Sequence, residues 1–187
     1  STDISPTFYR QFDITTAAYQ ARHDRINQYG GTVSKDFGDI VFKAEGVYTS
    51  GRSFSTLNIA DSDGVIRQNT LDWAAGLDIT LPAETRLNIQ LFQRHFFGYD
   101  SNITADRYEN GYSLLLNNKF FNNWEAQALF ISSLNRTDWL FRPRVTWNFE
   151  RNWRVAIGAD IFEGSALGMF GRYDQQDRLY SEVRYSF

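Results

Sequence analysis

The side chains of this 187-residue chain that could do chemistry are charged groups at every second position of regular segments. The largest group lies toward the C-terminus and comprises Arg142, Arg144, Arg154, Asp160, Arg178, Glu182 and Arg184. Five further charged residues lie upstream on the polar side of such segments, namely Lys43, Glu45, Asp72, Asp78 and Arg94. Alternate residues of a β-strand point to the same face of a sheet. If the segments that carry the C-terminal group are neighbouring strands, their charges form one cluster.

Two interpretations of this charge cluster are open, and both place it inside a β-barrel. In the first, the cluster is a positively biased constriction that selects anionic or polar solutes. In the second, the charges pair with one another and fill a narrow lumen, because buried charge is tolerated mainly when it is paired.

Catalytic motifs are weak or missing in the sequence. There is no cysteine, and there are two histidines. His23 adjoins Asp24, and such a pair could activate a water for hydrolysis, although ordinary polar loop residues explain it better. His95 falls on the apolar side of its segment, which favours an interfacial position. The run 61–64 (Asp-Ser-Asp-Gly) begins like a calcium loop but lacks the downstream glutamate, so it predicts a turn. We therefore expect no enzyme activity, no metal and no cofactor.

Segments with a period of two must position the charges. They are 24–35, 39–53, 68–81, 85–97, 108–120, 123–134, 138–149, 152–162 and 179–187, with 7–19 as a possible further strand. This period indicates strands with one apolar and one polar face. Pro143 interrupts one segment, and there we expect a β-bulge or a strand that starts near Arg144.

The connections between these segments alternate in length. One set is short: 36–38, 82–84, 121–123 and 150–152. The other set is mostly long and polar: 54–67, 98–107 and 163–175. Short turns at one end and long loops at the other are typical of transmembrane barrels. The sequence predicts an all-β fold with a single domain, 1–187, as a transmembrane antiparallel up-and-down β-barrel of about 10 strands. Within it, 1–23 is either a strand or a loop.

Aromatic residues make up 17% of the chain and gather beside the short turns. The expected aromatic belt comprises Phe120, Trp124, Trp147, Phe149, Trp153, Tyr185 and Phe187. Amphipathic rings prefer the headgroup zone of a bilayer. A soluble β-sandwich would also alternate, but mid-strand charges together with the belt favour a membrane. The net charge of -3 argues against a partner that is a nucleic acid.

Several motifs resemble those of a known family. They are Asp138-Trp139-Leu140-Phe141-Arg142-Pro143-Arg144, Asn152-Trp153-Arg154 with Gly158-Ala159-Asp160, Gly168-Met169-Phe170-Gly171-Arg172-Tyr173-Asp174 with Asp177-Arg178 and the closing segment, and, more weakly, Lys43-Ala44-Glu45-Gly46-Val47-Tyr48-Thr49. Over about 25–187 the chain is similar to a proteobacterial outer-membrane β-barrel family of uncharacterised function. The resemblance implies a multi-pass protein of the bacterial outer membrane and supplies no catalytic motif. Members of that family are longer, which implies that this chain could hold the C-terminal strands of a larger barrel.

The closing segment ends on an aromatic residue, Phe187, and such an end resembles the signal read by the barrel-assembly machinery. Expected partners are therefore outer-membrane lipids, that machinery, and another chain or a missing N-terminal barrel segment. The expected function is a passive channel or transport protein for small solutes. The alternative is a structural or interaction barrel with a closed lumen, which works through its extracellular loops or a partner chain.

Overall fold

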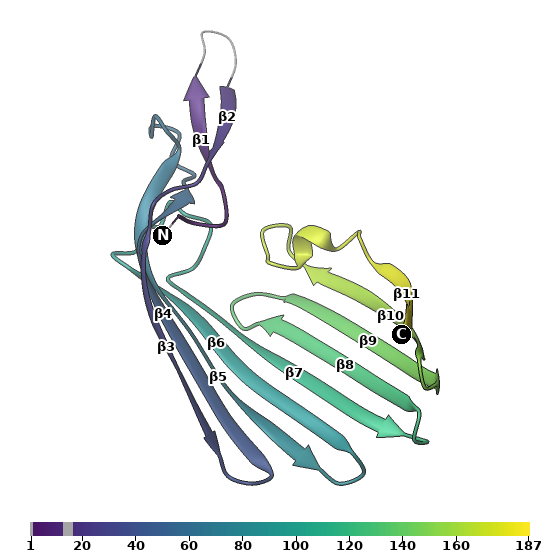
Figure 1. Cartoon of the computed structure of the whole chain (residues 1–187). Coiled ribbons are helices and arrows are strands. Elements are labelled where there is room, and N and C mark those ends of the chain that lie inside the picture. Colours follow the sequence, from purple (N-terminus) through teal and green to yellow (C-terminus); the bar gives the residue numbers. More distant parts are fainter. Residues whose placement is uncertain (1, 13–16) are drawn as a thin grey trace. The chain divides into compact units, whose positions relative to one another are not determined.

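Apolar and polar side chains alternate along most of the chain, and this period produces β-strands. The computed structural model describes residues 2–12 and 17–187, where the regular structure is β-strand apart from one short 3₁₀ turn. Nine strands form one antiparallel up-and-down sheet, and Figure 1 shows them following one another in chain order. They are β3 (Asn27–Asp36), β4 (Ile40–Ser55), β5 (Val65–Leu81), β6 (Thr85–Phe97), β7 (Tyr108–Phe120), β8 (Trp124–Ser133), β9 (Asp138–Glu150), β10 (Trp153–Gly164) and β11 (Arg178–Tyr185). The 3₁₀ turn η1 (Gly171–Tyr173) lies between β10 and β11.

The N-terminal segment forms a sheet of its own. β1 (Thr7–Phe12) and β2 (Ala17–Arg22) pair with each other in antiparallel orientation. The prediction of a further barrel strand over 7–19 is therefore wrong in its described part, and residues 13–16 fall outside the described residues. Each of these strands has six residues, whereas a membrane-crossing strand needs about nine to eleven. The large sheet accordingly has nine strands in place of about ten.

The nine segments predicted from 24 onward are confirmed as strands, and their ends shift by a few residues. The β-bulge expected at Pro143 and the alternative strand start near Arg144 are both wrong, because β9 begins at Asp138 and runs through Pro143 in unbroken register with β8. Against β10 the register is the same on both sides of Pro143. A proline lacks the N–H group of a ladder bond, yet here the strand tolerates it without a register shift.

The described chain divides into two compact units. The first consists of Ser1–Thr32, Glu45–Trp73 and Gln93–Glu109, and the second of Val33–Ala44, Ala74–Phe92 and Asn110–Phe187. In the first unit the Phe96 side chain is 1% exposed, and its ring packs edge-on against Phe54 and Tyr99. Two long loops meet there through a bridge between Thr56 and Ile103.

Two turns of the second unit share one geometry. Ala83 and Glu84 have φ angles of 57° and 52°, and Phe121 and Asn122 have φ angles of 48° and 58°. Two successive residues with positive φ give the turn whose twist matches an antiparallel hairpin. These tight turns join β5 to β6 and β7 to β8.

Burial in the sheet is inverted with respect to a water-soluble fold. Several buried side chains of the strands are polar: Thr49, Gln68, Thr70, Ser113, Asp138, Thr146 and Asp160. Large apolar side chains at the alternate strand positions, which point to the other side of the sheet, are exposed. Among them are Leu91, Leu116, Val145, Ile157, Leu179 and Val183. Buried polar groups and extended exposed apolar surface are the informative departures from ordinary folding. We name these two sides the charged face and the apolar face.

No helix within residues 2–12 and 17–187 has the length and apolar character needed to cross a membrane.

Candidate functional site

The predicted C-terminal charge cluster is assembled on β9, β10 and β11. Asp160 lies opposite Arg178 in the β10–β11 register. Its Oδ1 atom accepts a hydrogen bond from Nε of Arg142, and its Oδ2 atom lies 2.5 Å from Nε of Arg178. The Asp160 side chain is 1% exposed, whereas the two arginine side chains are 39% and 64% exposed. One buried carboxylate is therefore held between two partly exposed guanidinium groups.

A second group of the same composition lies further along these strands. Glu182 binds Arg144 through Oε2 and Arg184 through Oε1, each at 3.0 Å. We call Arg142–Asp160–Arg178 and Arg144–Glu182–Arg184 the two arginine triads. In each triad, one carboxylate is shared between two arginines.

Gly158 separates the two triads on β10. It lies opposite Arg144 on β9 and opposite Tyr180 on β11. A Cβ atom at this position would stand 2.5 Å from the Tyr180 hydroxyl oxygen and 3.0 Å from the Pro143 carbonyl oxygen. Glycine is therefore required for the Tyr180 ring to lie across β10.

Arg154 is the remaining residue of the predicted cluster. It lies opposite Arg184 in the β10–β11 register, and its Nε atom donates to Oδ1 of Asn148 at 2.8 Å. With Arg154, five arginines share this part of the charged face with the two carboxylates Asp160 and Glu182. The region therefore keeps an excess of positive charge when its ion pairs are counted, and we call it the arginine stripe.

The predicted upstream charges form two smaller groups. In the second unit, Lys43 Nζ lies 2.6 Å from Asp78 Oδ2, and the Asn88 amide donates to Asp78 Oδ1 at 2.5 Å. Glu45 is exposed. In the first unit, Arg94 Nε lies 2.5 Å from Asp72 Oδ1. The ion pair in each of these groups is neutral, whereas the arginine stripe has an excess of positive charge.

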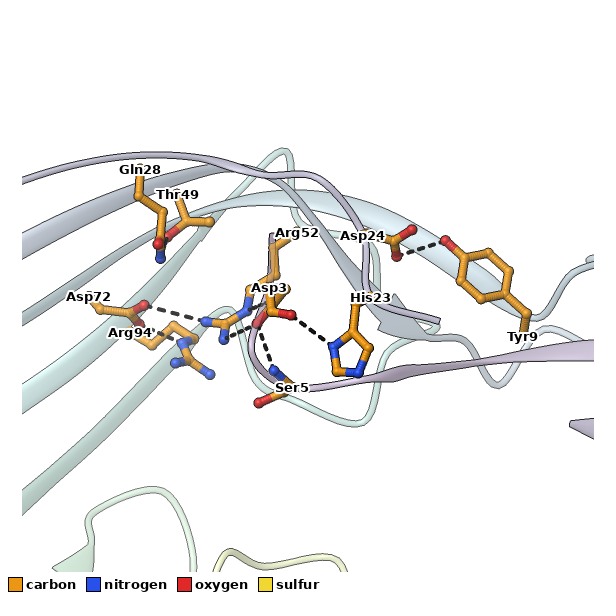
Figure 2. A network of polar contacts seen from close by, with 10 residues as sticks. All are labelled: Asp3, Ser5, Tyr9, His23, Asp24, Gln28, Thr49, Arg52, Asp72 and Arg94. Carbon is orange, nitrogen blue, oxygen red and sulfur yellow. Dashed lines mark hydrogen bonds and ion pairs between the residues drawn. The ribbon is translucent and has the colours of Figure 1, made fainter. Parts of the chain in front are cut away.

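Asp72 and Arg94 belong to a network that the sequence did not reveal in full (Figure 2). Arg52 lies 3.9 Å from Asp72 and donates from Nε to Oδ2 of Asp3 at 2.9 Å. Asp3 also accepts the Ser5 N–H at 3.1 Å and is 7% exposed. Two carboxylates and two guanidinium groups thus balance in charge, and we call them the N-terminal network.

Arg52 reaches the charged face because β4 is irregular at Gly51. This glycine has a φ of 76°, and its N–H donates to the Asn69 side chain. A glycine in the left-handed region of a strand is the mark of a bulge, which shifts the alternation by one residue. The Arg52 side chain therefore lies near Asp72 on the charged face. Strict alternation along β4 would have placed it on the opposite face from Lys43 and Thr49. A glycine inside the predicted strand 39–53 was the signal that could have revealed it.

The His23–Asp24 pair has separate partners. Nδ1 of His23 lies 2.9 Å from the Asp3 carbonyl oxygen, and the Asp24 carboxylate accepts the Tyr9 hydroxyl at 2.7 Å. Burial raises the pKa of Asp24, but the nearby Ser53 hydroxyl, the hydrogen bond from Tyr9 and the nearby guanidinium groups of Arg67 and Arg22 outweigh it and hold this pKa below its ordinary value. The hydrolytic interpretation of His23 therefore gains no support from its contacts.

The contacts of His95 and of the turn at 61–64 are those of structural residues. The His95 ring stacks on Tyr108 with centroids 4.6 Å apart and lies 4.4 Å from the Phe97 ring. Asp61 and Asp63 accept the N–H groups of Asp63 and Val65, as in a turn. Among residues 2–12 and 17–187, no group of three or more metal-ligating side chains comes together.

Asp138 forms an unpredicted site at the start of β9. It is 1% exposed, and its carboxylate accepts the N–H groups of Met169, Phe170 and Gly171 at 2.7, 3.0 and 2.7 Å. A Cβ atom on Gly168 would stand 2.4 Å from Oδ1 of Asp138. The carboxylate thus fixes the loop that leads into β11.

The predicted aromatic belt forms a chain of ring contacts in the second unit. Successive centroids lie 6.3 Å apart from Phe120 to Trp124, 5.4 Å to Trp147, 4.9 Å to Phe149, 6.2 Å to Trp153 and 4.9 Å to Tyr185. Phe187 follows β11 and is fully exposed. The row crosses five neighbouring strands beside the turns that follow β7 and β9.

Comparison of the chain with protein-family models, curated proteins and solved structures gave no match. The geometry of the chain itself therefore carries the functional argument.

Proposed function

We propose that the nine-stranded sheet forms the wall of a transmembrane β-barrel in a bacterial outer membrane. We propose further that this barrel is a passive channel for small solutes. The observation that carries the proposal is the inverted burial of the sheet. Apolar side chains such as Leu116, Ile157 and Val183 are exposed on one face, and lipid would cover them there. Polar side chains such as Thr146 and Asp160 are buried on the other face.

The aromatic row supports the orientation of the proposed barrel. A continuous band of rings lies beside the short turns and comprises Phe120, Trp124, Trp147, Phe149, Trp153 and Tyr185. Such bands are expected at the bilayer interface. The short turns would then face the periplasm, and the long loops would face the outside.

The arginine stripe supports a preference for anions. Five guanidinium groups and two carboxylates share one stretch of wall. Rings of arginine or lysine are typical of pores for anions. Their partly exposed side chains would present positive charge to solutes in the lumen.

A permeability measurement tests the proposed channel. The protein is reconstituted in planar bilayers under a salt gradient, and the reversal potential gives its anion-to-cation permeability ratio. The double variant Arg144→Gln, Arg184→Gln removes two charges of the stripe and should shift the ratio toward cations by about twofold or more. Arg151→Gln, in the exposed turn before β10, is the matched control and should leave the ratio unchanged. An unchanged ratio in the double variant would contradict the selectivity.

A second candidate is a closed barrel that acts through its loops or a partner chain. The pairing of both carboxylates in the arginine triads favours it, since paired charges can fill a narrow lumen. Absence of conductance in the unaltered protein, with intact insertion in the bilayer, would decide for this candidate.

A further inference from the structure

Two arginines of the arginine stripe lie directly opposite each other on neighbouring strands. Arg154 on β10 and Arg184 on β11 are partners in the antiparallel register. The Ser186 N–H donates to the Asn152 carbonyl at 2.9 Å, and the two arginines lie two places along the strands from this hydrogen-bonded pair. They are therefore a pair of the same type, with Cα atoms about 5.5 Å apart. Like charges directly opposite each other on a sheet are destabilising, so this pair calls for negative charge beside it.

The other end of the stripe shows how the protein neutralises such a row of charges. There Asp160 lies on the middle strand β10, between an arginine of β9 and an arginine of β11. In the Arg154 row the middle strand carries an arginine instead. Its partner on β9 is the neutral side chain of Asn148, and its partner on β11 is Arg184. The same three strands thus hold a built-in anion in one row and lack one in the other.

Glu182 neutralises this end of the stripe only in part. It binds both Arg144 and Arg184, whereas Arg154 forms no ion pair with any residue in the ranges 2–12 and 17–187. Three guanidinium groups therefore share one carboxylate, which leaves two positive charges in this group.

The two opposed guanidinium groups can still accept a ligand. Arg154 is exposed and donates to Asn148 from Nε. The Arg184 side chain is 61% exposed and donates to Glu182 from one Nη atom. A guanidinium group has five N–H donors in a planar fork that fits two oxygens of one phosphate or carboxylate group. The contacts that Arg154 makes within the described part of the chain leave both of its Nη atoms for such a pair of oxygens.

We propose that Arg154 and Arg184 hold a divalent tetrahedral oxyanion of the phosphate class between their guanidinium groups. Its two charges equal the two that the protein leaves. A tetrahedral anion offers a separate pair of oxygens to each fork, whereas a planar monocarboxylate offers one pair and a halide offers none. The inference rests on the proposed anion channel, to which it gives a substrate class and a binding site.

Phosphate groups also occur in lipids, but the position of the two arginines favours a soluble ligand. The adjacent residues Trp153 and Tyr185 are register partners whose rings lie 4.9 Å apart in the aromatic row. Successive residues of a strand point to opposite faces, so Arg154 and Arg184 lie on the other side of the sheet from these rings. A bilayer that meets the aromatic row would therefore place its headgroups on the face away from the two arginines.

Phosphate binding by the purified protein in uncharged detergent micelles tests the proposal without a conductance measurement. Inorganic phosphate is titrated in mildly alkaline buffer, where it is divalent, and binding is followed by the broadening of its phosphorus NMR signal. Arg154→Gln and Arg184→Gln should each lower the affinity by about tenfold or more. Arg151→Gln, in the exposed turn before β10, removes the same charge outside the site and should leave the affinity unchanged.

Asn148→Asp is the sharpest variant, because it places a carboxylate on the residue that already bonds to Arg154. It gives the row a built-in anion, as Asp160 does at the other end of the stripe. The variant should lose phosphate binding by about tenfold or more, with a free energy of unfolding no lower than that of the unaltered protein. Loss of binding through misfolding is thereby separated from loss through charge.

Three results would overturn the inference. One is no binding of phosphate by the unaltered, folded protein. Another is equal phosphate affinity in Asn148→Asp and the unaltered protein. The third is displacement of phosphate by phosphatidylglycerol in the micelles at equal concentration, which would assign the site to a lipid headgroup. Phosphate binding without conductance would support the site and refute the channel, whereas conductance without phosphate binding would refute the site alone.

Discussion

The two units of the molecule pair their carboxylates with arginines in different ratios. In the N-terminal network, Asp3 and Asp72 balance Arg52 and Arg94. In the second unit, each triad holds one carboxylate between two arginines. The N-terminal network is neutral and connects its segments, whereas each triad keeps a net positive charge. Charge pairing and residual net charge are therefore separate properties of the charged face.

The largest expected loss of stability comes from removing a buried carboxylate that binds a loop, and each unit has one such carboxylate. Asp138→Ala leaves three backbone N–H groups without their acceptor and should lower the free energy of unfolding by about 3 kcal/mol or more. Asp3→Ala loses one backbone donor and one arginine, and should cost about half as much. Denaturant titrations of both variants in detergent micelles measure the difference. Equal costs would contradict the distinct role given to the Asp138 loop.

The next largest loss of stability comes from neutralising a carboxylate that binds arginines in either unit. Asp160→Asn leaves Arg142 and Arg178 close together without a shared anion and should lower the free energy of unfolding by about 2 kcal/mol. Asp72→Asn should cost about 1 kcal/mol, since Arg52 keeps Asp3. The same titration compares the two, and a larger loss for Asp72→Asn would reverse the comparison.

A smaller effect concerns the glycines of the two regions. Gly158→Ala forces the Tyr180 ring away from β10 and should destabilise by about 1–2 kcal/mol. Gly31→Ala on β3 is the control, because its added methyl group meets nothing within 4 Å. If both substitutions are neutral, the packing of Tyr180 between the triads is not a requirement of the sheet.

The smallest effect tests the first unit alone. The folded-state pKa of Asp24 lies below its unfolded value of about 3.9. Its contribution to stability is therefore present above the unfolded pKa and is lost as the pH falls through the folded pKa. Tyr9→Phe removes one donor and should raise the Asp24 pKa in an NMR titration. Tyr19→Phe, an exposed tyrosine of β2, should leave it unchanged, and equal pKa values in all three proteins would refute the role of Tyr9.

The strands and the gathering of the C-terminal charges could be predicted because both depend on local alternation. The individual partners in the triads could not, because they depend on strand register, which places Asp160 opposite Arg178. Arg52 was missed because the bulge at Gly51 changes its parity. Asp138 was missed because its three donors belong to a loop with no period. The N-terminal hairpin was missed because short mixed strands resemble one interrupted strand.

The measurement that tests the central claim most directly is the accessibility of spin labels on the two faces of the sheet. The chain has no cysteine, so single cysteines can be placed at Leu116 and Asn117 on β7 and at Val183 and Arg184 on β11. In liposomes, labels at Leu116 and Val183 should be relaxed by oxygen, which concentrates in lipid, and labels at Asn117 and Arg184 by a water-soluble nickel complex. Relaxation of the Leu116 and Val183 labels by the nickel complex, or by neither agent, would contradict a lipid-facing apolar surface.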